Sequence, residues 1–163
     1  MSQTFRITIV ADSREQRPYA FEGYVCQVAR AGLPSGDYST PGHEDALAVE
    51  RKELGDLVNC LSRERDRFER ELARLSVMRC PRVIVEASVE DVRRHRYASR
   101  MLPHAVLQSV VALEQRYRVP FTWAGNRPGG EYLTYWSIQK FLREMQQATK
   151  VEVSPEALEE ERP

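Results

Sequence analysis

The feature that most constrains the fold is a change of hydrophobic period after residue 52. Residues 46–52, ALAVERK, form an apolar strand-like run that ends in three adjacent charges. Directly after it, Leu54, Leu57, Val58 and Leu61 follow one another at helical spacing. The chain is therefore predicted to pass from a strand straight into a helix, as it does in folds that alternate the two elements.

The same alternation runs through the rest of the chain. Residues 62–67 contain no apolar side chain, which predicts a bend before the helical spacing resumes at Phe68. Residues 92–100 are predicted to be a basic surface segment. The further strands are predicted at 5–12, 24–33, 34–40 (a turn and a short strand), 81–88 and 119–125, and the further helices at 102–118 and 131–149. The prediction is an α/β fold: a β-meander, then helices and strands in turn, with a mixed central sheet flanked by helices.

Length and composition indicate one domain, at residues 1–150, because single cores commonly hold about 100–200 residues. Residues 151–163 contain five Glu against one Arg and are predicted to be a disordered acidic tail. No apolar run approaches the ~18 residues of a membrane span, and the N-terminus shows no signal peptide. The three scattered cysteines favour free thiols in a reducing compartment, so we expect a cytoplasmic, nucleoid-associated protein.

Two carboxylates and a lysine are predicted to share one face of a hairpin. Glu50 and Lys52 are two residues apart on a strand and point to the same side, whereas Arg51 points away. The turn at 41–45 would bring Asp37 opposite them. Crowded carboxylates are costly unless a cation neutralises them, and Mg²⁺ with a nearby lysine suits phosphodiester hydrolysis. The alternative is plain surface, because an acid two residues before a lysine is common at strand ends.

A longer pattern extends this short motif. Gly36-Asp37, followed by ERKELGD at 50–56, matches a GD…ERKxxxD signature, and ADSRE at 11–15 precedes it. On these residues the chain resembles the XPF family of structure-specific nucleases, which includes the archaeal Hef nuclease domain. Further similar segments, at 56–75, 81–86 and 113–125, extend the resemblance over roughly residues 5–145.

The resemblance implies a restriction-endonuclease-like core and a DNA endonuclease that depends on Mg²⁺ or Mn²⁺ and cuts near branched or flap DNA. It implies that Asp37 and Glu50 ligate the metal with the Arg51 carbonyl, that Asp12 lies close by through water, and that Lys52 is the catalytic lysine. Asp56 is either a partner behind these ligands or an ordinary first-turn acid that favours the helix dipole. The side chain of Arg51 is expected to brace a carboxylate or contact DNA.

Several arginines are candidate DNA contacts. By resemblance, Arg14 and Arg67 would contact the scissile phosphate, although Arg67 also suits a solvated helix face. Arg93, Arg94 and Arg96 lie in a stretch nearly free of acids and are either phosphate contacts or solvated.

The assembly of the chain is also open to prediction. The last predicted helix carries a wide apolar stripe, from Tyr132 to Met145, that suits either the core or a homodimer interface. Most members of the family carry tandem helix-hairpin-helix domains, which these 163 residues do not show, so a separate DNA-binding partner is possible.

Two other functions fit the same residues. One is a non-catalytic DNA-binding or scaffold subunit of a nuclease complex, because the family includes inactive partners. The other is a recombination or restriction nuclease of the same fold that acts on unbranched DNA. The acids and the lysine are all present in this chain, which favours an enzyme over a scaffold.

Overall fold

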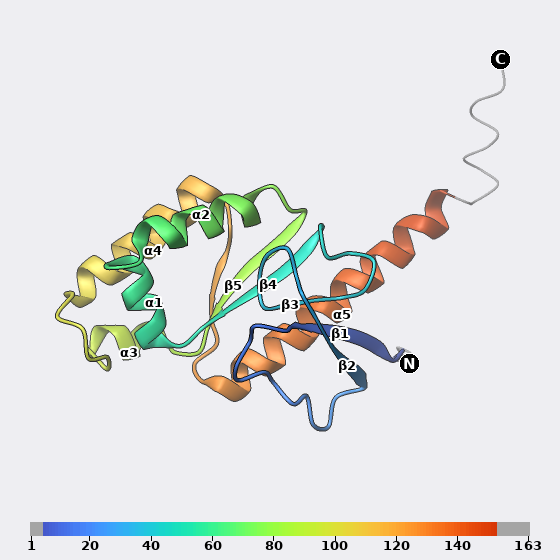
Figure 1. Cartoon of the computed structure of the whole chain (residues 1–163), viewed down its shortest axis with the longest axis horizontal. Coiled ribbons are helices and arrows are strands. Elements are labelled where there is room, and N and C mark those ends of the chain that lie inside the picture. The colour runs from blue at the N-terminus through green and yellow to red at the C-terminus, as the bar shows by residue number, and fades with distance from the viewer. Residues whose placement is uncertain (1–4, 153–163) are drawn as a thin grey trace, which may run out of the picture.

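Strand β4 (Leu47–Lys52) lies inside a six-stranded mixed sheet, and its end carries the charges noted in the sequence. The computed structural model describes residues 5–152. The strand order is β2-β1-β3-β4-β5-β6 (Figure 1). The other strands are β1 (Ile7–Asp12), β2 (Cys26–Ala31), β3 (Tyr38–Ser39), β5 (Cys80–Val85) and β6 (Phe121–Trp123). The helices are α1 (Leu54–Leu61), α2 (Arg65–Ser76), α3 (Val89–Arg93), α4 (Pro103–Tyr117) and α5 (Arg127–Glu152). The predicted α/β fold with a mixed sheet is confirmed.

The pairing of the first strands differs from the predicted meander. β3 pairs with β4 as the expected antiparallel hairpin, but β1 pairs antiparallel with β3 and parallel with β2. A parallel pair needs a long crossover connection. Residues 13–25 provide it, and they bury Tyr19 and Phe21 in the core, which a meander turn would not do. Strands β4, β5 and β6 are mutually parallel.

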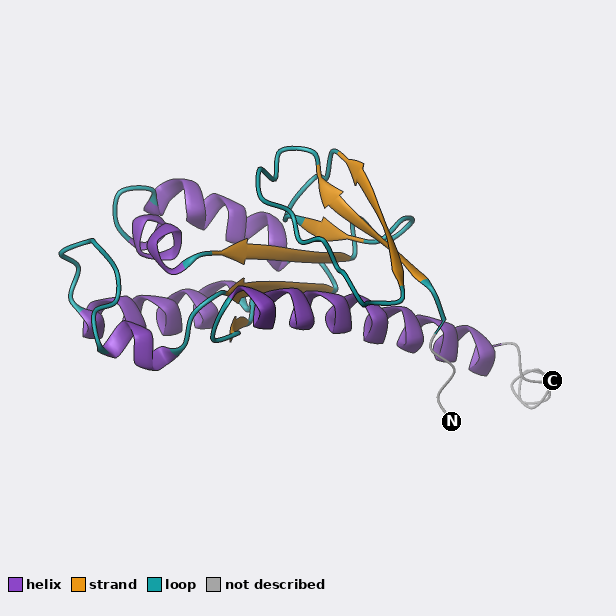
Figure 2. Cartoon of the chain, turned by 90° about the horizontal axis from the view of Figure 1, so that it is seen from below, coloured by secondary structure: helices purple, strands orange, loops and turns teal. Residues whose placement is uncertain are grey.

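The sheet separates two hydrophobic cores. On one face, Ala48, Val83 and Val85 pack with the buried side chains of α1, α2 and α4. On the other face, Leu47 and Val49 join the cluster that also contains the buried residues of α5, which runs along this side of the sheet (Figure 2). Successive residues of β4 therefore face different helices.

The sequence prediction missed one helix, α3, and placed the start of another, α5, too late. The segment 92–100 was expected to be irregular surface, but α3 begins at Val89, because Ser88 and Asp91 form a reciprocal capping box. Helix α5 begins at Arg127 rather than at 131, because Gly129 and Gly130 are helical instead of forming a turn. A Cβ at Gly129 would overlap the Ala124 carbonyl and one at Gly130 the Tyr19 hydroxyl, so close packing explains this glycine pair.

Other predictions are resolved more simply. The expected break at 62–67 separates α1 from α2, and Leu75 lies near the end of α2. Helix α5 extends to Glu152, so the first two residues of the tail predicted at 151–163 are helical instead of disordered. The rest of that tail, from 153 onward, lies outside the described residues. Within residues 5–152, none of the helices is both long and apolar enough to span a bilayer. The three cysteines are free thiols and only partly buried.

Candidate active site

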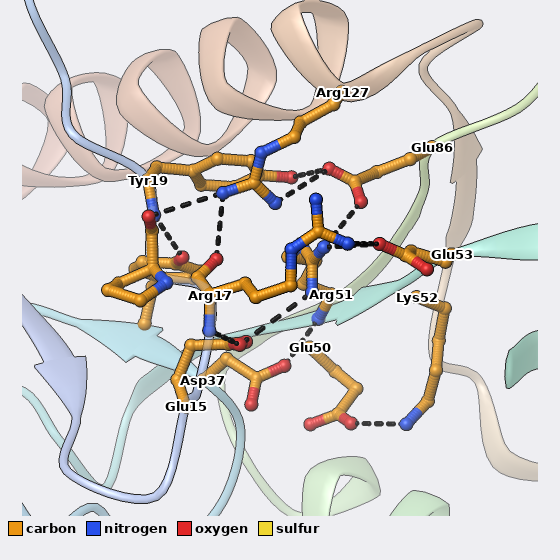
Figure 3. Close-up of polar contacts among 12 residues, drawn as sticks. Glu15, Arg17, Tyr19, Asp37, Glu50, Arg51, Lys52, Glu53, Glu86 and Arg127 are labelled. Carbon is orange, nitrogen blue, oxygen red and sulfur yellow. Dashed lines mark hydrogen bonds and ion pairs between the residues drawn. The ribbon is translucent and has the colours of Figure 1, made fainter.

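The end of β4 presents different chemistry on its two faces. Glu50 and Lys52 continue the face of Ala48 and point toward α2, whereas Arg51 continues the face of Leu47 and Val49 (Figure 3). The predicted separation of Arg51 from its two neighbours is therefore what the structure shows.

The hairpin brings Asp37 to this strand end. The Asp37 N–H donates to the Val49 carbonyl at 2.8 Å, and the Arg51 N–H donates to Asp37 Oδ2 at 2.7 Å. The preceding Gly36 has a φ of +77°, and a Cβ there would lie 3.0 Å from the Cβ of Ala48. Glycine is thus required by both the backbone conformation and the close approach of β4, which explains the Gly-Asp pair.

Burial and nearby negative charges disfavour the ionised form of both carboxyl groups. Burial, and then the neighbouring Glu50, raises the pKa of Asp37 to about 8. Burial also raises the pKa of Glu50. The positive charge of Lys52 lowers this pKa only in part, and the negative charge of Glu71 raises it further. At neutral pH without a cation, this face therefore disfavours a second negative charge, so a bound cation would relieve a real electrostatic cost.

Lys52 is held in place beside Glu50. Its Nζ donates to Glu50 Oε1 at 2.7 Å and lies 5.4 Å from the ring centroid of Phe68 on α2. Burial alone would lower the pKa of Lys52, but the surrounding negative charges, led by Glu50, and the hydrogen bond to Glu50 together outweigh burial and raise the pKa. The ammonium therefore stays charged and has a defined position next to the carboxylates.

The donor set fits a divalent metal that keeps several waters. In the part of the chain that the structure describes, no three His, Cys, Asp or Glu residues are arranged as a complete metal cage. Mg²⁺ binds commonly through one or two carboxylates, with water and phosphate oxygens in its other positions. Asp37 and Glu50 line the same hollow and have raised pKa values, so they supply this partial set.

Asp12 and Asp56 lie at the edges of this site. Asp12 lines the same hollow as Asp37 and Glu50, but both of its carboxylate oxygens are engaged. Oδ2 accepts from Arg14 Nε at 2.8 Å and Oδ1 accepts from the Leu33 N–H at 3.0 Å. Asp56 is exposed in the first turn of α1 and lines the groove that holds Lys52. Both roles predicted for Asp56, a partner behind the metal ligands and a first-turn acid, fit this position.

Two predicted phosphate contacts line the groove around Glu50. Arg14 is 72% exposed, and Nη2 donates to the Leu33 carbonyl. Arg67 is 82% exposed and makes only a long ion pair with Glu64, at 3.5 Å. Both line the hollow that contains Asp37 and Glu50. The charge of Arg67 is therefore available to an anion in the groove, whereas Arg14 would share its charge between the anion and Asp12.

The other three predicted DNA contacts are placed differently. Arg93 and Arg94 pair with Glu90, at 3.6 and 2.8 Å, and Arg96 pairs with Asp91 at 2.7 Å. Among the described residues, none of the three lines the groove of Glu50 and Lys52. The sequence stretch looked free of acids because its partners lie just before it, in the first turn of α3.

Behind the groove, Arg51 holds together an acidic cluster (Figure 3). Its guanidinium pairs with Glu86 at 2.8 Å, Glu53 at 3.1 Å and Glu15 at 3.7 Å. Glu86 also accepts from the Tyr19 hydroxyl at 2.8 Å. These contacts join the hairpin, β5 and the crossover loop, so Arg51 braces carboxylates, as one of its two predicted roles required.

The sequence interpretation missed some residues of this site. Glu71 lines the groove with Glu50, accepts from the Gly36 N–H at 3.3 Å and pairs with Arg74. Its spacing from Arg67 and Arg74, four and three residues, puts all three on one helix face and could have revealed it. Glu86, Tyr19 and Arg127 carry no comparable signal, because only the tertiary fold brings Glu86 and Tyr19 to Arg51 and Arg127 to Glu86.

Comparisons with known proteins agree with this geometry. No curated protein matches the sequence. The structure resembles XPF from Aeropyrum pernix with a TM-score of 0.68 and 22% identity, over 89% of this chain and 70% of that one. It also resembles XPF from Aeropyrum pernix in complex with DNA, with a TM-score of 0.66 and 25% identity, over 91% of this chain and 68% of that one. The ERCC4 domain model matches residues 11–129, so the chain belongs to the ERCC4 domain family of DNA nucleases and has the fold of the XPF nuclease domain.

Proposed function

We propose that the chain is an endonuclease that hydrolyses phosphodiester bonds in DNA with the help of Mg²⁺ or Mn²⁺. The observation that carries the proposal is a pair of crowded carboxyl groups, the buried Glu50 and the partly buried Asp37, beside a charged Lys52 in an open groove. Such a face is unfavourable by itself and becomes favourable when a cation binds.

The metal would be held by Asp37 and Glu50, with the backbone carbonyl of Arg51 as a further donor. When bound, it would lower the pKa of a water molecule and stabilise the negative charge that develops on the phosphate. Arg51 contributes through its N–H, which orients Asp37 Oδ2 at 2.7 Å. Its side chain holds the acids behind the groove and so keeps the end of β4 in position.

Lys52 has the most direct role among the protein's own groups. Its ammonium is fixed between Glu50 and Phe68 and remains charged. From this position it would orient the attacking water or stabilise the phosphate oxygens as negative charge accumulates on them. Asp12 and Asp56 would support the site from its two edges.

DNA would lie along the groove with its phosphates at Arg14 and Arg67. The likeness to XPF in complex with DNA supports binding of DNA by this fold. Arg93, Arg94 and Arg96 would add a weaker, salt-sensitive contribution because their local acids offset their charge. We propose branched or flap DNA as the preferred substrate, following the family to which the chain belongs.

A homodimer through α5 is part of this proposal. Tyr132 is 53% exposed, and the groove between α5 and the start of β5 has an apolar lining that includes Leu133, Trp136 and Met145. An uncovered apolar surface of this kind suits a protein interface. The dimer, or a separate DNA-binding partner, would supply grip on duplex DNA. A monomeric mass by light scattering at tens of micromolar protein would contradict the homodimer.

The deciding experiment uses labelled duplex, single strand, 3′ flap, fork and four-way junction DNA with Mg²⁺ or Mn²⁺. We expect cutting of the branched substrates that requires metal and is abolished in both Asp37→Ala and Lys52→Ala. Equal cutting of plain duplex would instead indicate a recombination or restriction type of nuclease. Binding without cutting by the wild type and both variants would indicate a scaffold subunit.

A further inference from the structure

A second cavity, of about 610 Å³, lies against α1 next to the catalytic groove. One wall is formed by α1 and the turn after it, and the other by the loop at 97–101 that leads from α3 to α4 (Figure 1). Asn59 lines both this cavity and the groove that contains Glu50 and Lys52. A polymer that passes through the catalytic groove could therefore continue into the cavity.

The charge of this cavity is positive and uncompensated. Arg63 and Arg100 line it, and in the described part of the chain neither forms an ion pair with a carboxylate. No Asp or Glu is among the described residues of its lining. Arg93 and Arg94 on the neighbouring helix pair with Glu90, so unpaired arginines are not a general property of this region.

An aromatic side chain with a fixed position also faces the cavity. Tyr97 lines it, and its hydroxyl donates to the Met101 carbonyl at 2.7 Å. The His95 ring stacks on Tyr97 with the ring centroids 4.3 Å apart. Proteins that bind single-stranded nucleic acid combine cations that contact the backbone with aromatic rings on which bases stack.

We infer that this cavity binds an unpaired nucleotide of the DNA strand that leaves the catalytic groove. Arg63 and Arg100 contact its phosphates, and Tyr97 contacts the base. A paired base would not have a free face for Tyr97, so the occupant is single-stranded, as at a fork or flap. The inference rests on the proposed nuclease function and adds a substrate-binding site to it.

The main test is the double variant Arg63→Gln with Arg100→Gln, in binding and cleavage. Fluorescence anisotropy with a labelled single strand and a labelled fork is measured over a range of salt concentrations. On the single strand, the log–log salt slope should become shallower by about 0.7 for each phosphate that the variant no longer neutralises. In cleavage of the fork, KM should rise while kcat stays the same, because the arginines bind but do not react.

Gly55→Gln blocks the cavity without removing a charge. A Cβ at Gly55 meets no atom within 4 Å, and the position lies on the helix α1, so the longer side chain can enter the cavity without strain. Replacing a helical glycine favours the helix, so thermal unfolding should not occur at a lower temperature. Affinity for the single strand should still fall.

The matched control is Arg118→Asn. It removes one positive charge at the C-terminus of α4, whereas the cavity loop at 97–101 leads into the N-terminus of this helix. Arg118 caps the C-terminus of α4 with a φ of 56°, a conformation that asparagine tolerates. This variant should bind and cleave as the wild type does.

The two proposals can fail separately. If the wild type cleaves the fork but the double variant and Gly55→Gln match it in affinity, salt slope and KM, the cavity site is wrong and the nuclease stands. A loss of affinity confined to duplex DNA, with a salt slope that changes by about 0.9 per phosphate, would also contradict the binding of an unpaired nucleotide. If the wild type cuts no DNA, the proposed function itself fails.

Discussion

The two faces of β4 carry similar charges with opposite outcomes. On the side of α5, Arg51 satisfies three acids, Glu15, Glu53 and Glu86, within the described residues. On the side of α2, Asp37 and Glu50 have one cation, Lys52, and both have raised pKa values. The first, closed face balances its three acids with Arg17, Arg51 and Arg127, whereas the second becomes favourable only with a bound cation.

This difference separates a structural cluster from the proposed functional site. Groups that must act on a substrate are often held in surroundings that disfavour one of their charge states. The Arg51 cluster also gathers several acids, but each of them pairs with an arginine. A count of charged residues in ERKELGD would not distinguish the two faces, whereas the pairing geometry does.

The largest expected effect on stability comes from removing Arg51, the central cation of the closed face. Arg51→Met would leave Glu86, which is only 3% exposed, without its nearest cationic partner. Breaking a buried ion pair from one side typically costs about 3–5 kcal/mol of unfolding free energy. Urea unfolding in metal-free buffer measures this. Arg70→Met, at an exposed position of α2 with no side-chain partner among the described residues, is the control and should cost less than about 0.5 kcal/mol.

A decrease below about 1 kcal/mol in Arg51→Met, the typical size for an exposed pair, would show that the closed face contributes little to stability. The contrast between the two faces would then no longer hold.

The corresponding change on the other face should affect the reaction instead. Lys52→Met should lower the cleavage rate by about 10²–10³-fold, the usual effect of removing one group that stabilises developing charge. Its unfolding free energy should change less than that of Arg51→Met, because Glu50 already has a raised pKa and can be protonated. The measurement is single-turnover cleavage with saturating Mg²⁺ or Mn²⁺.

Lys150→Met serves as the control for this rate, because Lys150 is exposed in the last turn of α5, away from the groove. Cleavage by Lys52→Met within about tenfold of the wild type would contradict the role of Lys52.

Asp37 provides a test through pH. Its pKa is about 8 in the folded protein, against an ordinary value of 3.8, so between these values the folded state holds a proton that the unfolded state has released. Stability therefore falls as pH rises from about 4 to 8. Asp37→Asn should remove this part of the slope and raise the unfolding free energy at pH 8, without metal, by on the order of 1–3 kcal/mol.

Adding Mg²⁺ should then stabilise the wild type more than Asp37→Asn. Thermal unfolding at pH 5 and pH 8, with and without metal, measures both effects. Equal pH slopes for the two proteins would show that Asp37 is not crowded.

The smallest effect is expected at the edge of the closed face. Arg17 pairs with Glu53 at 2.8 Å, but the two side chains are 66% and 42% exposed. Exposed ion pairs contribute about 0–1 kcal/mol, so Arg17→Gln should cost less than about 1 kcal/mol in the same urea measurement. A cost near that of Arg51→Met would show that the exposed pair of Arg17 and Glu53, and not the buried Glu86, makes the main contribution of the cluster to the unfolding free energy.

Local patterns in the sequence predicted much of the fold and the centre of the site. Residues two apart on a strand share a face, so the opposition of Arg51 to Glu50 and Lys52 follows from the sequence alone. The helix after Lys52 and the break before α2 follow from the spacing of apolar side chains. The Gly36-Asp37 pair marks the turn that leads into β3, where only glycine fits.

Tertiary structure alone decided what these local elements meet. The parallel pairing of β1 with β2, the burial of Tyr19 and the approach of Gly130 to it depend on segments far apart in the chain. The same holds for the pairing of Arg51 with Glu86 and for the cavity between α1 and the loop after α3. Periodicity determines the face of a strand or helix on which a side chain lies. The partner of that side chain is determined by how the faces pack together. A single sequence contains no direct record of that packing.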